Sequence, residues 1–151
     1  MITSLTHIHS LLRWIILAML LVSIIKAFSG KGRGKDFKLT DGKFFMLTMM
    51  LIHIQILVGI ALYTMSPLIE SAMKSKEGIM GDTINRFWVV EHGLGMLIAT
   101  ILITIGYSKS KKIVNTTKRY STVAWTYLIA LVIIFTSIPW PFRNLGVGTW
   151  F

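Results

Sequence analysis

The chain of 151 residues contains no cysteine. This absence excludes disulfides, thiolate metal sites, iron–sulfur clusters and the covalent attachment of a c-type haem. Acidic residues are scarce, with 6 Asp and Glu against 16 Lys and Arg, so the formal net charge is +10. On a soluble protein such an excess would suggest nucleic acid as a partner. Here most basic residues lie between apolar segments, so membrane topology explains them better and no nucleic acid is expected.

Catalytic motifs are missing as well. The chain has no nucleophile–base pair and no hydrolytic motif, and the glycine-rich residues 30–34 lack the spacing of a phosphate-binding loop. We therefore predict neither a hydrolase nor a transferase. The sequence leaves open whether the protein is an enzyme.

Hydrophobic residues dominate the composition, at 54%, and the mean hydropathy is +0.68. Four apolar segments are long enough to cross about 30 Å of hydrocarbon as helices, because backbone groups in lipid must bond within their own segment. The segments are residues 8–28, 44–64, 87–107 and 122–138. Short connections favour antiparallel neighbours. We predict an all-α integral membrane four-helix antiparallel bundle, with residues 1–151 as a single transmembrane domain. The first segment lacks a charged leading region and a cleavage site, so we interpret it as a retained helix.

The distribution of basic residues predicts the orientation. Six lie in residues 26–43 and five in residues 109–119, together eleven of the sixteen. Loops rich in Lys and Arg remain on the cytoplasmic side. The middle loop, residues 65–86, carries three basic and three acidic residues. We therefore expect this loop and both termini outside the membrane.

Ionisable residues inside the apolar segments are the candidate functional groups, because such groups are costly in lipid. They are His9, Arg13, His53, Glu91 and His92, with His7 at the margin. From the rise of a helix, His9, Arg13, Glu91 and His92 form an outer layer, and His53 lies near the midplane. Because Arg13 and Glu91 have similar depth and opposite charge, we predict that they form an ion pair.

Small and aromatic residues suggest how the helices pack and where they meet the membrane surface. Gly93, Gly95 and Ala99 are expected to leave space beside His92. Gln55, Gly59 and Tyr63 form a stripe that suits helix packing or a homodimer contact. Aromatic residues near the segment ends are interpreted mostly as an interfacial belt. These are Trp14, Trp88, Trp125, Tyr127, Trp140 and Trp150.

Histidines that project inward from different helices of a membrane bundle are the usual way to hold haem b. His92 is the leading candidate ligand. Its expected partner is His9 if the site lies near the outer surface, or His53 if a tilted haem spans the offset in depth. Arg13 is a candidate partner for a haem propionate, an alternative to its pairing with Glu91.

Three pieces of the chain carry a family resemblance. Residues 7–14 (HIHSLLRW), 86–92 (RFWVVEH) and 138–143 (IPWPFR) resemble a family of small bacterial four-helix membrane proteins labelled cytochrome b or cytochrome b-like. The resemblance implies b-type haem and electron transfer in the bacterial inner membrane, with quinone as a candidate partner. His9, His53 and His92 are the matching ligand candidates. The fourth segment contains no histidine, so one or two haems at most could be served.

Two other functions remain open. The chain could be a non-catalytic subunit or assembly factor of a larger membrane assembly such as a respiratory complex, with structural histidines. It could also hold a metal or proton-transfer site built from His9, His53, Glu91 and His92, since imidazoles and a carboxylate suit copper or zinc.

Overall fold

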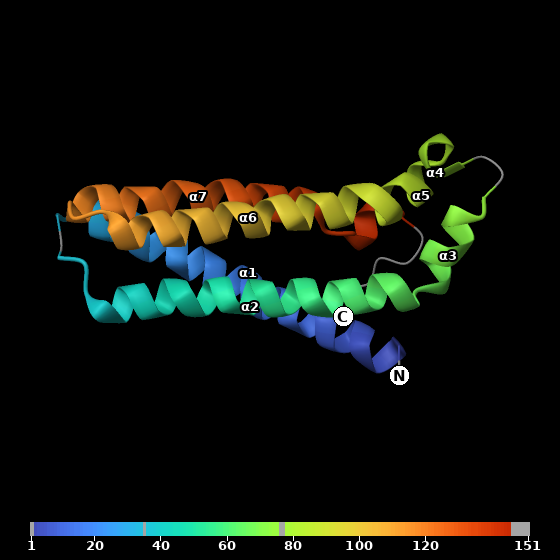
Figure 1. The fold of residues 1–151 in the computed structure, drawn as a ribbon, viewed down its shortest axis with the longest axis horizontal. Helices are drawn as coiled ribbons and strands as arrows, with labels where there is room; N and C mark the ends of the chain where they lie inside the picture. Colours follow the sequence, from blue (N-terminus) through green and yellow to red (C-terminus); the bar gives the residue numbers. More distant parts are fainter. Residues whose placement is uncertain (1, 35, 76–77, 146–151) are drawn as a thin grey trace.

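The computed structural model describes residues 2–34, 36–75 and 78–145, and these residues form helices and connecting turns (Figure 1). Four long helical segments carry the fold. They are α1 (Ile2–Gly32), α2 (Leu39–Met65), α6 (His92–Lys112) and α7 (Thr116–Ser137). Short α5 (Thr83–Arg86) and the π-helical turn η1 (Phe87–Glu91) run directly into α6. The connections also contain α3 (Pro67–Met73), α4 (Gly78–Gly81) and the 3-10 turn η2 (Pro141–Arg143).

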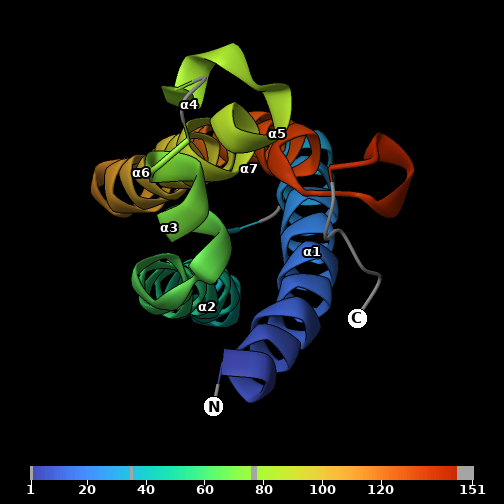
Figure 2. The ribbon, with the colours of Figure 1, turned by 90° about the vertical axis from the view of Figure 1, so that its right-hand side faces the viewer.

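The four long segments pack as a ring in the order α1, α2, α6, α7, so α1 lies diagonally across from α6 (Figure 2). Helices α1, α2 and α7, and the continuous helix Thr83–Lys112 that joins α5, η1 and α6, are each long and apolar enough to cross a membrane. The prediction of an all-α four-helix bundle is therefore confirmed. The helices extend beyond the predicted apolar segments at most ends, because polar residues continue them into the connections.

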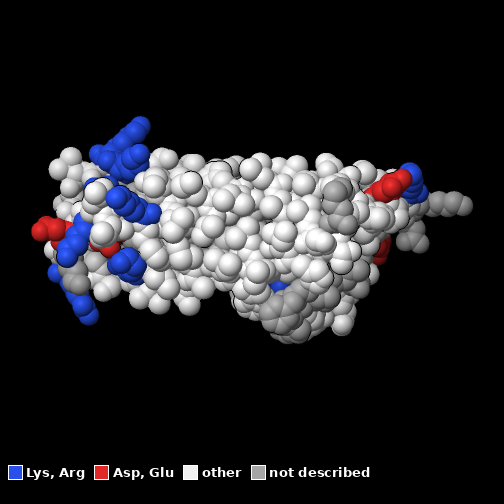
Figure 3. Space-filling model, turned by 90° about the horizontal axis from the view of Figure 1, so that it is seen from below, with Lys and Arg blue, Asp and Glu red and all other residues white. Residues whose placement is uncertain are grey.

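The two ends of the bundle differ in charge. The end that contains residues 31–43 and 109–119, here called the basic end, gathers most Lys and Arg side chains (Figure 3). The opposite end, here called the histidine end, contains His9, His92 and the first and last described residues, Ile2 and Leu145. Helix α1 crosses the bundle obliquely and diverges from α7 toward the N-terminus (Figure 1, Figure 2).

Glycines bring α6 and α7 together more extensively than any other pair of helices. A Cβ atom at Gly95 would collide with the hydroxyl of Ser137, and one at Gly106 would collide with the hydroxyl of Thr126. Close approach through small residues is a common way to pack helices in membranes. The space beside Gly95 is therefore filled by α7, which corrects the expectation that it is open for a cofactor.

Polar contacts also join the helices in the core. The buried hydroxyls of Ser23 on α1 and Thr48 on α2 lie 2.9 Å apart. The Tyr127 hydroxyl crosses from α7 and donates to the carbonyl oxygen of Phe45 on α2 at 2.9 Å. Tyr127 is fully buried, so its assignment to the interfacial belt was wrong. Trp150 lies outside the described residues.

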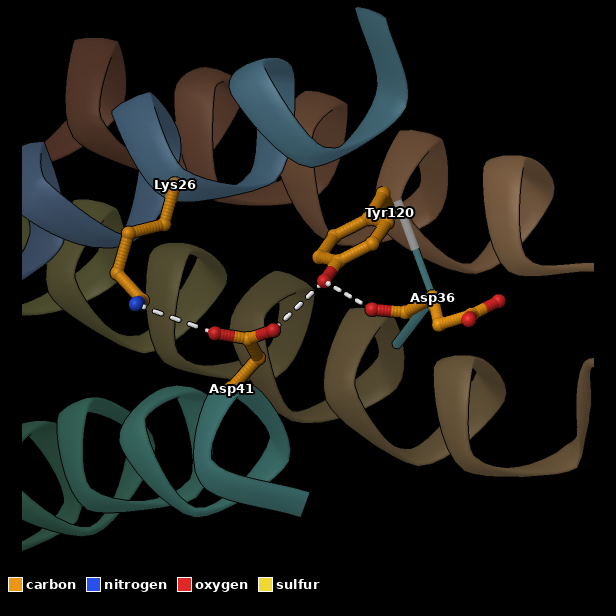
Figure 4. Close-up of polar contacts among 4 residues, drawn as sticks. All are labelled: Lys26, Asp36, Asp41 and Tyr120. Carbon is orange, nitrogen blue, oxygen red and sulfur yellow. Dashed lines mark hydrogen bonds and ion pairs between the residues drawn. The ribbon is translucent and has the colours of Figure 1, made fainter. Parts of the chain in front are cut away.

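A polar clasp fixes the basic end (Figure 4). The Asp41 carboxylate pairs with Lys26 of α1 at 3.1 Å and accepts a hydrogen bond from the Tyr120 hydroxyl of α7 at 2.6 Å. The Tyr120 ring lies directly against Gly30, where any side chain would overlap it. One carboxylate thus ties α2 to α1 and α7.

Candidate functional site

Helix α7 ends where proline removes its hydrogen-bond donors. In an α-helix the carbonyl of residue i accepts from the N–H of residue i+4, and proline has no N–H. Pro139 and Pro141 therefore deprive the carbonyl oxygens of Phe135 and Ser137 of their usual donors. The indole nitrogen of Trp140 donates to Phe135 at 2.8 Å. Ser137 receives its donor from α6.

That donor is His92. Its Nδ1 lies 2.7 Å from the Ser137 carbonyl oxygen, and because a carbonyl only accepts, Nδ1 carries the proton. In the neutral imidazole the other nitrogen, Nε2, then carries a lone pair. The rings of Phe87 and Trp88 lie beside the imidazole, with centroids 6.0 and 5.9 Å away. The bond to Ser137 therefore fixes both the orientation and the tautomer of His92.

A π-helical turn, Phe87–Glu91, immediately precedes His92. The backbone N–H of His92 bonds to the Phe87 carbonyl, five residues back. Within this turn the carbonyl of Val89 accepts a hydrogen bond from the Tyr63 hydroxyl of α2 at 3.1 Å. Single π turns occur frequently at functional sites. No feature of the sequence indicated this turn, which rotates all later residues of α6 relative to the earlier ones.

His9 lies on α1, on the face that meets α2. The Gln55 side-chain nitrogen donates to the backbone carbonyl of His9 at 3.0 Å. A Cβ atom at Gly59 would contact the imidazole carbon Cε1 at 3.4 Å. The Gln55–Gly59 stripe thus packs helix against helix, the first of its two predicted uses. Within the described part of the chain, the buried atoms His9 Nδ1 and Gln55 Oε1 make no hydrogen bond.

Arg13 lies one turn further along α1 and does not pair with Glu91. Its guanidinium lies against the rings of Trp14 and Trp140, 5.5 and 6.0 Å from their centroids. Glu91 instead accepts from Arg86 Nε at 2.7 Å, and both side chains are substantially exposed. The predicted Arg13–Glu91 ion pair is therefore wrong. The Glu91 carboxylate is directed toward Arg86 at the end of α5.

The structure brings His9, Arg13 and His92 together. Each of the three lies close enough to the other two for direct electrostatic interaction. His9 and His92 come from diagonally opposite helices, so the pair spans the bundle near the histidine end. The pairing of His92 with His9 on one cofactor stays a prediction.

His53 does not join them. Its Nδ1 donates to the Met49 carbonyl at 2.8 Å, and its Nε2 lies 3.3 Å from the Thr104 hydroxyl. Thr104 lies three helical turns, about 18 Å, further along α6 than His92. One haem iron cannot bind both His53 and His92 at this separation. His7 is exposed at the N-terminal end of α1.

His9, His92 and Arg13 are of the residue types that could hold a haem. Two imidazoles from different helices and a nearby guanidinium suit an iron and a propionate. The described residues include no group of three or more His, Cys, Asp or Glu placed to hold a metal ion.

Comparisons with known proteins add no assignment: no family model, curated protein or solved structure matches the chain. Its function is therefore argued from the site itself.

Proposed function

We propose that this protein is a membrane-embedded b-type haem protein that takes part in electron transfer, in which His9 and His92 would hold the haem. The observation that carries the proposal is that His9 and His92 extend from diagonally opposite helices α1 and α6 and interact electrostatically near one end of the bundle. A haem held in this way supplies one-electron chemistry, and its potential depends on ligands, hydrogen bonds and burial.

Each residue of the site has a defined task in this proposal. His92 presents Nε2, because its Nδ1–H is engaged by the Ser137 carbonyl. Such a hydrogen bond on the outer nitrogen is the usual second partner of a metal-binding histidine. Arg13 supplies positive charge for a propionate, and the neighbouring rings of Trp14 and Trp140 hold its guanidinium in place.

The experiment compares difference spectra, reduced minus oxidised, of the wild type and four single variants. His9→Ala and His92→Ala are expected to lose the haem signal. His53→Ala and His7→Ala are matched controls that should retain it, because both side chains lie away from the pair. Full haem binding in either of the first two variants would contradict the assignment.

The proposed location is the bacterial inner membrane, with the basic end cytoplasmic, both termini outside and quinone as the candidate redox partner. Val114 is 97% exposed at the basic end and Ser71 is exposed in α3 near the opposite end. Because the chain has no cysteine, Val114→Cys and Ser71→Cys can be labelled without background. An impermeant reagent added outside should label only position 71, and labelling of position 114 would reverse the orientation.

A second candidate is a non-catalytic subunit of a larger membrane assembly. The observation that favours it is that His92 already has a structural partner, since it satisfies the carbonyl of Ser137 left without a donor by Pro141. The haem content of the wild-type protein distinguishes the two functions. A wild-type protein that carries no haem after expression with ample haem supply supports the subunit and excludes the haem carrier.

A further inference from the structure

A groove between α2 and α6 opens toward the basic end, away from the His9–His92 pair. Its volume is about 650 Å³. Helices α2 and α6 have the least extensive contact of the four neighbouring pairs in the ring, which explains why the groove lies there. At the end of the groove nearer the middle of the bundle, exposed His53 lies beside Thr104, with 3.3 Å between Nε2 and Oγ1.

Each residue of α6 that lines the groove carries a polar group. Tyr107, Ser108, Lys111 and Lys112 line it together with Thr104, and their spacing of three, four, seven and eight residues places them on one helical face. Polar side chains at membrane depth are costly unless they have partners. Thr104 and Tyr107 lie within the predicted apolar segment, whereas Ser108, Lys111 and Lys112 lie at the basic end, so the groove leads from the apolar part of the bundle to its charged end.

Two hydroxyl groups on this wall lack partners. Neither Tyr107 nor Ser108 makes a side-chain hydrogen bond within the described residues, although Thr100 and Thr104 of the same helix both bond to carbonyls one turn back. The Ser110 hydroxyl likewise bonds to the carbonyl of Tyr107. Both groove hydroxyls are thus available as hydrogen-bond donors.

Two lysines form the rim. Lys111 and Lys112 are exposed, and neither forms a salt bridge with another described residue. The ammonium group of Lys111 lies 5.8 Å from the centroid of the Tyr107 ring, which holds it over the groove. Ammonium groups at a membrane surface attract the phosphates of anionic lipids.

The opposite wall is apolar and adaptable. Met46, Met49 and Met50 of α2 line it, and methionine side chains fill irregular space readily because they are unbranched and flexible. The three features correspond to the three parts of an anionic phospholipid. The lysine rim suits the anionic head group, the hydroxyls suit the polar ester region, and the methionine wall suits the hydrocarbon chains.

We propose that this groove binds one anionic phospholipid. Lys111 and Lys112 bind the phosphate, Ser108 and Tyr107 donate to phosphate or ester oxygens, and the methionine wall contacts an acyl chain. The proposal does not depend on haem, because the lining residues are separate from His9, Arg13 and His92.

The test is native mass spectrometry of the full chain in detergent, titrated with phosphatidylglycerol or phosphatidylcholine. The wild type should bind one phosphatidylglycerol at least ten-fold more tightly than phosphatidylcholine. Lys111→Gln with Lys112→Gln should abolish this preference. Lys109→Gln with Lys118→Gln is the matched control, since it removes the same charge at the same end outside the groove and should retain the preference. Ser108→Leu, which obstructs the groove without changing its charge, should weaken binding as well.

Several outcomes would overturn the proposal. Equal binding of the two lipids would show that the groove does not select the anionic head. Equal losses in the two double variants would reduce the effect to net charge. Inorganic phosphate that displaces the bound lipid in millimolar amounts would show an ion site in place of a lipid site. Circular dichroism of every variant checks that the helices remain folded.

Discussion

The Nδ1 atom of His92 donates a hydrogen bond of 2.7 Å to the carbonyl oxygen of Ser137 and joins α6 to the end of α7. The bond exists because Pro141 occupies the position whose N–H would otherwise bind that carbonyl. It gives His92 a structural task through one ring nitrogen and leaves the other nitrogen for a ligand. The two tasks can therefore be separated by substitution.

The first prediction separates them. His92→Ala leaves the Ser137 carbonyl without a donor and should lower the free energy of unfolding by about 1–3 kcal/mol. His92→Asn provides an amide N–H near the position of Nδ1 and should restore most of this loss, but it has no counterpart of Nε2. We expect the Asn variant to melt near the wild-type temperature in detergent while it fails to retain haem. Equal destabilisation by Asn and Ala would contradict the structural task.

The second prediction concerns Gln55. An imidazole that binds iron through Nε2 needs an acceptor for its Nδ1–H, and Gln55 Oε1 is a buried acceptor without a hydrogen bond in the described part of the chain, on the interface that holds His9. Gln55→Leu should weaken haem retention on the order of ten-fold. Gln55→Glu keeps an acceptor and should retain haem. Unchanged haem content in the Leu variant, measured by pyridine haemochrome assay, would exclude this role.

The third prediction uses two nearby glycines. In Gly95→Ala the new methyl group meets the Ser137 side chain, so the α6–α7 contact must open, at a cost of about 1–3 kcal/mol. Gly93→Ala is the control, because no atom lies within 4 Å of its added Cβ. Alanine has the higher helix propensity, so this variant should be neutral or more stable by up to about 1 kcal/mol. Thermal melts in the same detergent compare the two, and similar melting temperatures would argue against close packing at Gly95.

The fourth prediction tests the clasp at the basic end. Tyr120→Phe removes the hydrogen bond to the Asp41 carboxylate and should cost about 1.5–3 kcal/mol, the range for bonds to a charged group. Tyr107→Phe is the control in lipid-free detergent, since its hydroxyl bonds to no described residue, and it should change stability by less than about 0.5 kcal/mol. A Tyr120 variant as stable as this control would show that the clasp contributes little.

The bundle could be predicted from the sequence because the features that indicate it, apolar segment length and the positions of basic residues, are read directly along the chain. Apolar length determines where a helix crosses lipid, and the uneven distribution of basic residues depends only on order along the chain. The same reasoning placed His9 and His92 in one layer, and in the structure the two residues interact electrostatically at the histidine end. It also showed that His53 lies deeper than that layer.

The sequence could not predict the direction that each side chain takes around its helix axis. The π turn Phe87–Glu91 inserts the equivalent of one residue and changes the face that each side chain presents, which depth alone does not reveal. Glu91 accordingly pairs with Arg86 and not with Arg13. Tyr127 was assigned by residue type, although its hydroxyl reaches a carbonyl in the core. One missed contact did have a signal, since Pro141 four residues after Ser137 marks a carbonyl that needs a donor.

The central claim is that His9 and His92 bind the same iron, and electron paramagnetic resonance of the oxidised wild-type protein tests it most directly. We expect the low-spin ferric signal of a haem with two imidazole ligands, and its conversion to a high-spin signal or its loss in both His9→Ala and His92→Ala. A wild-type protein without this signal, or a low-spin signal that persists in either variant, would contradict the account.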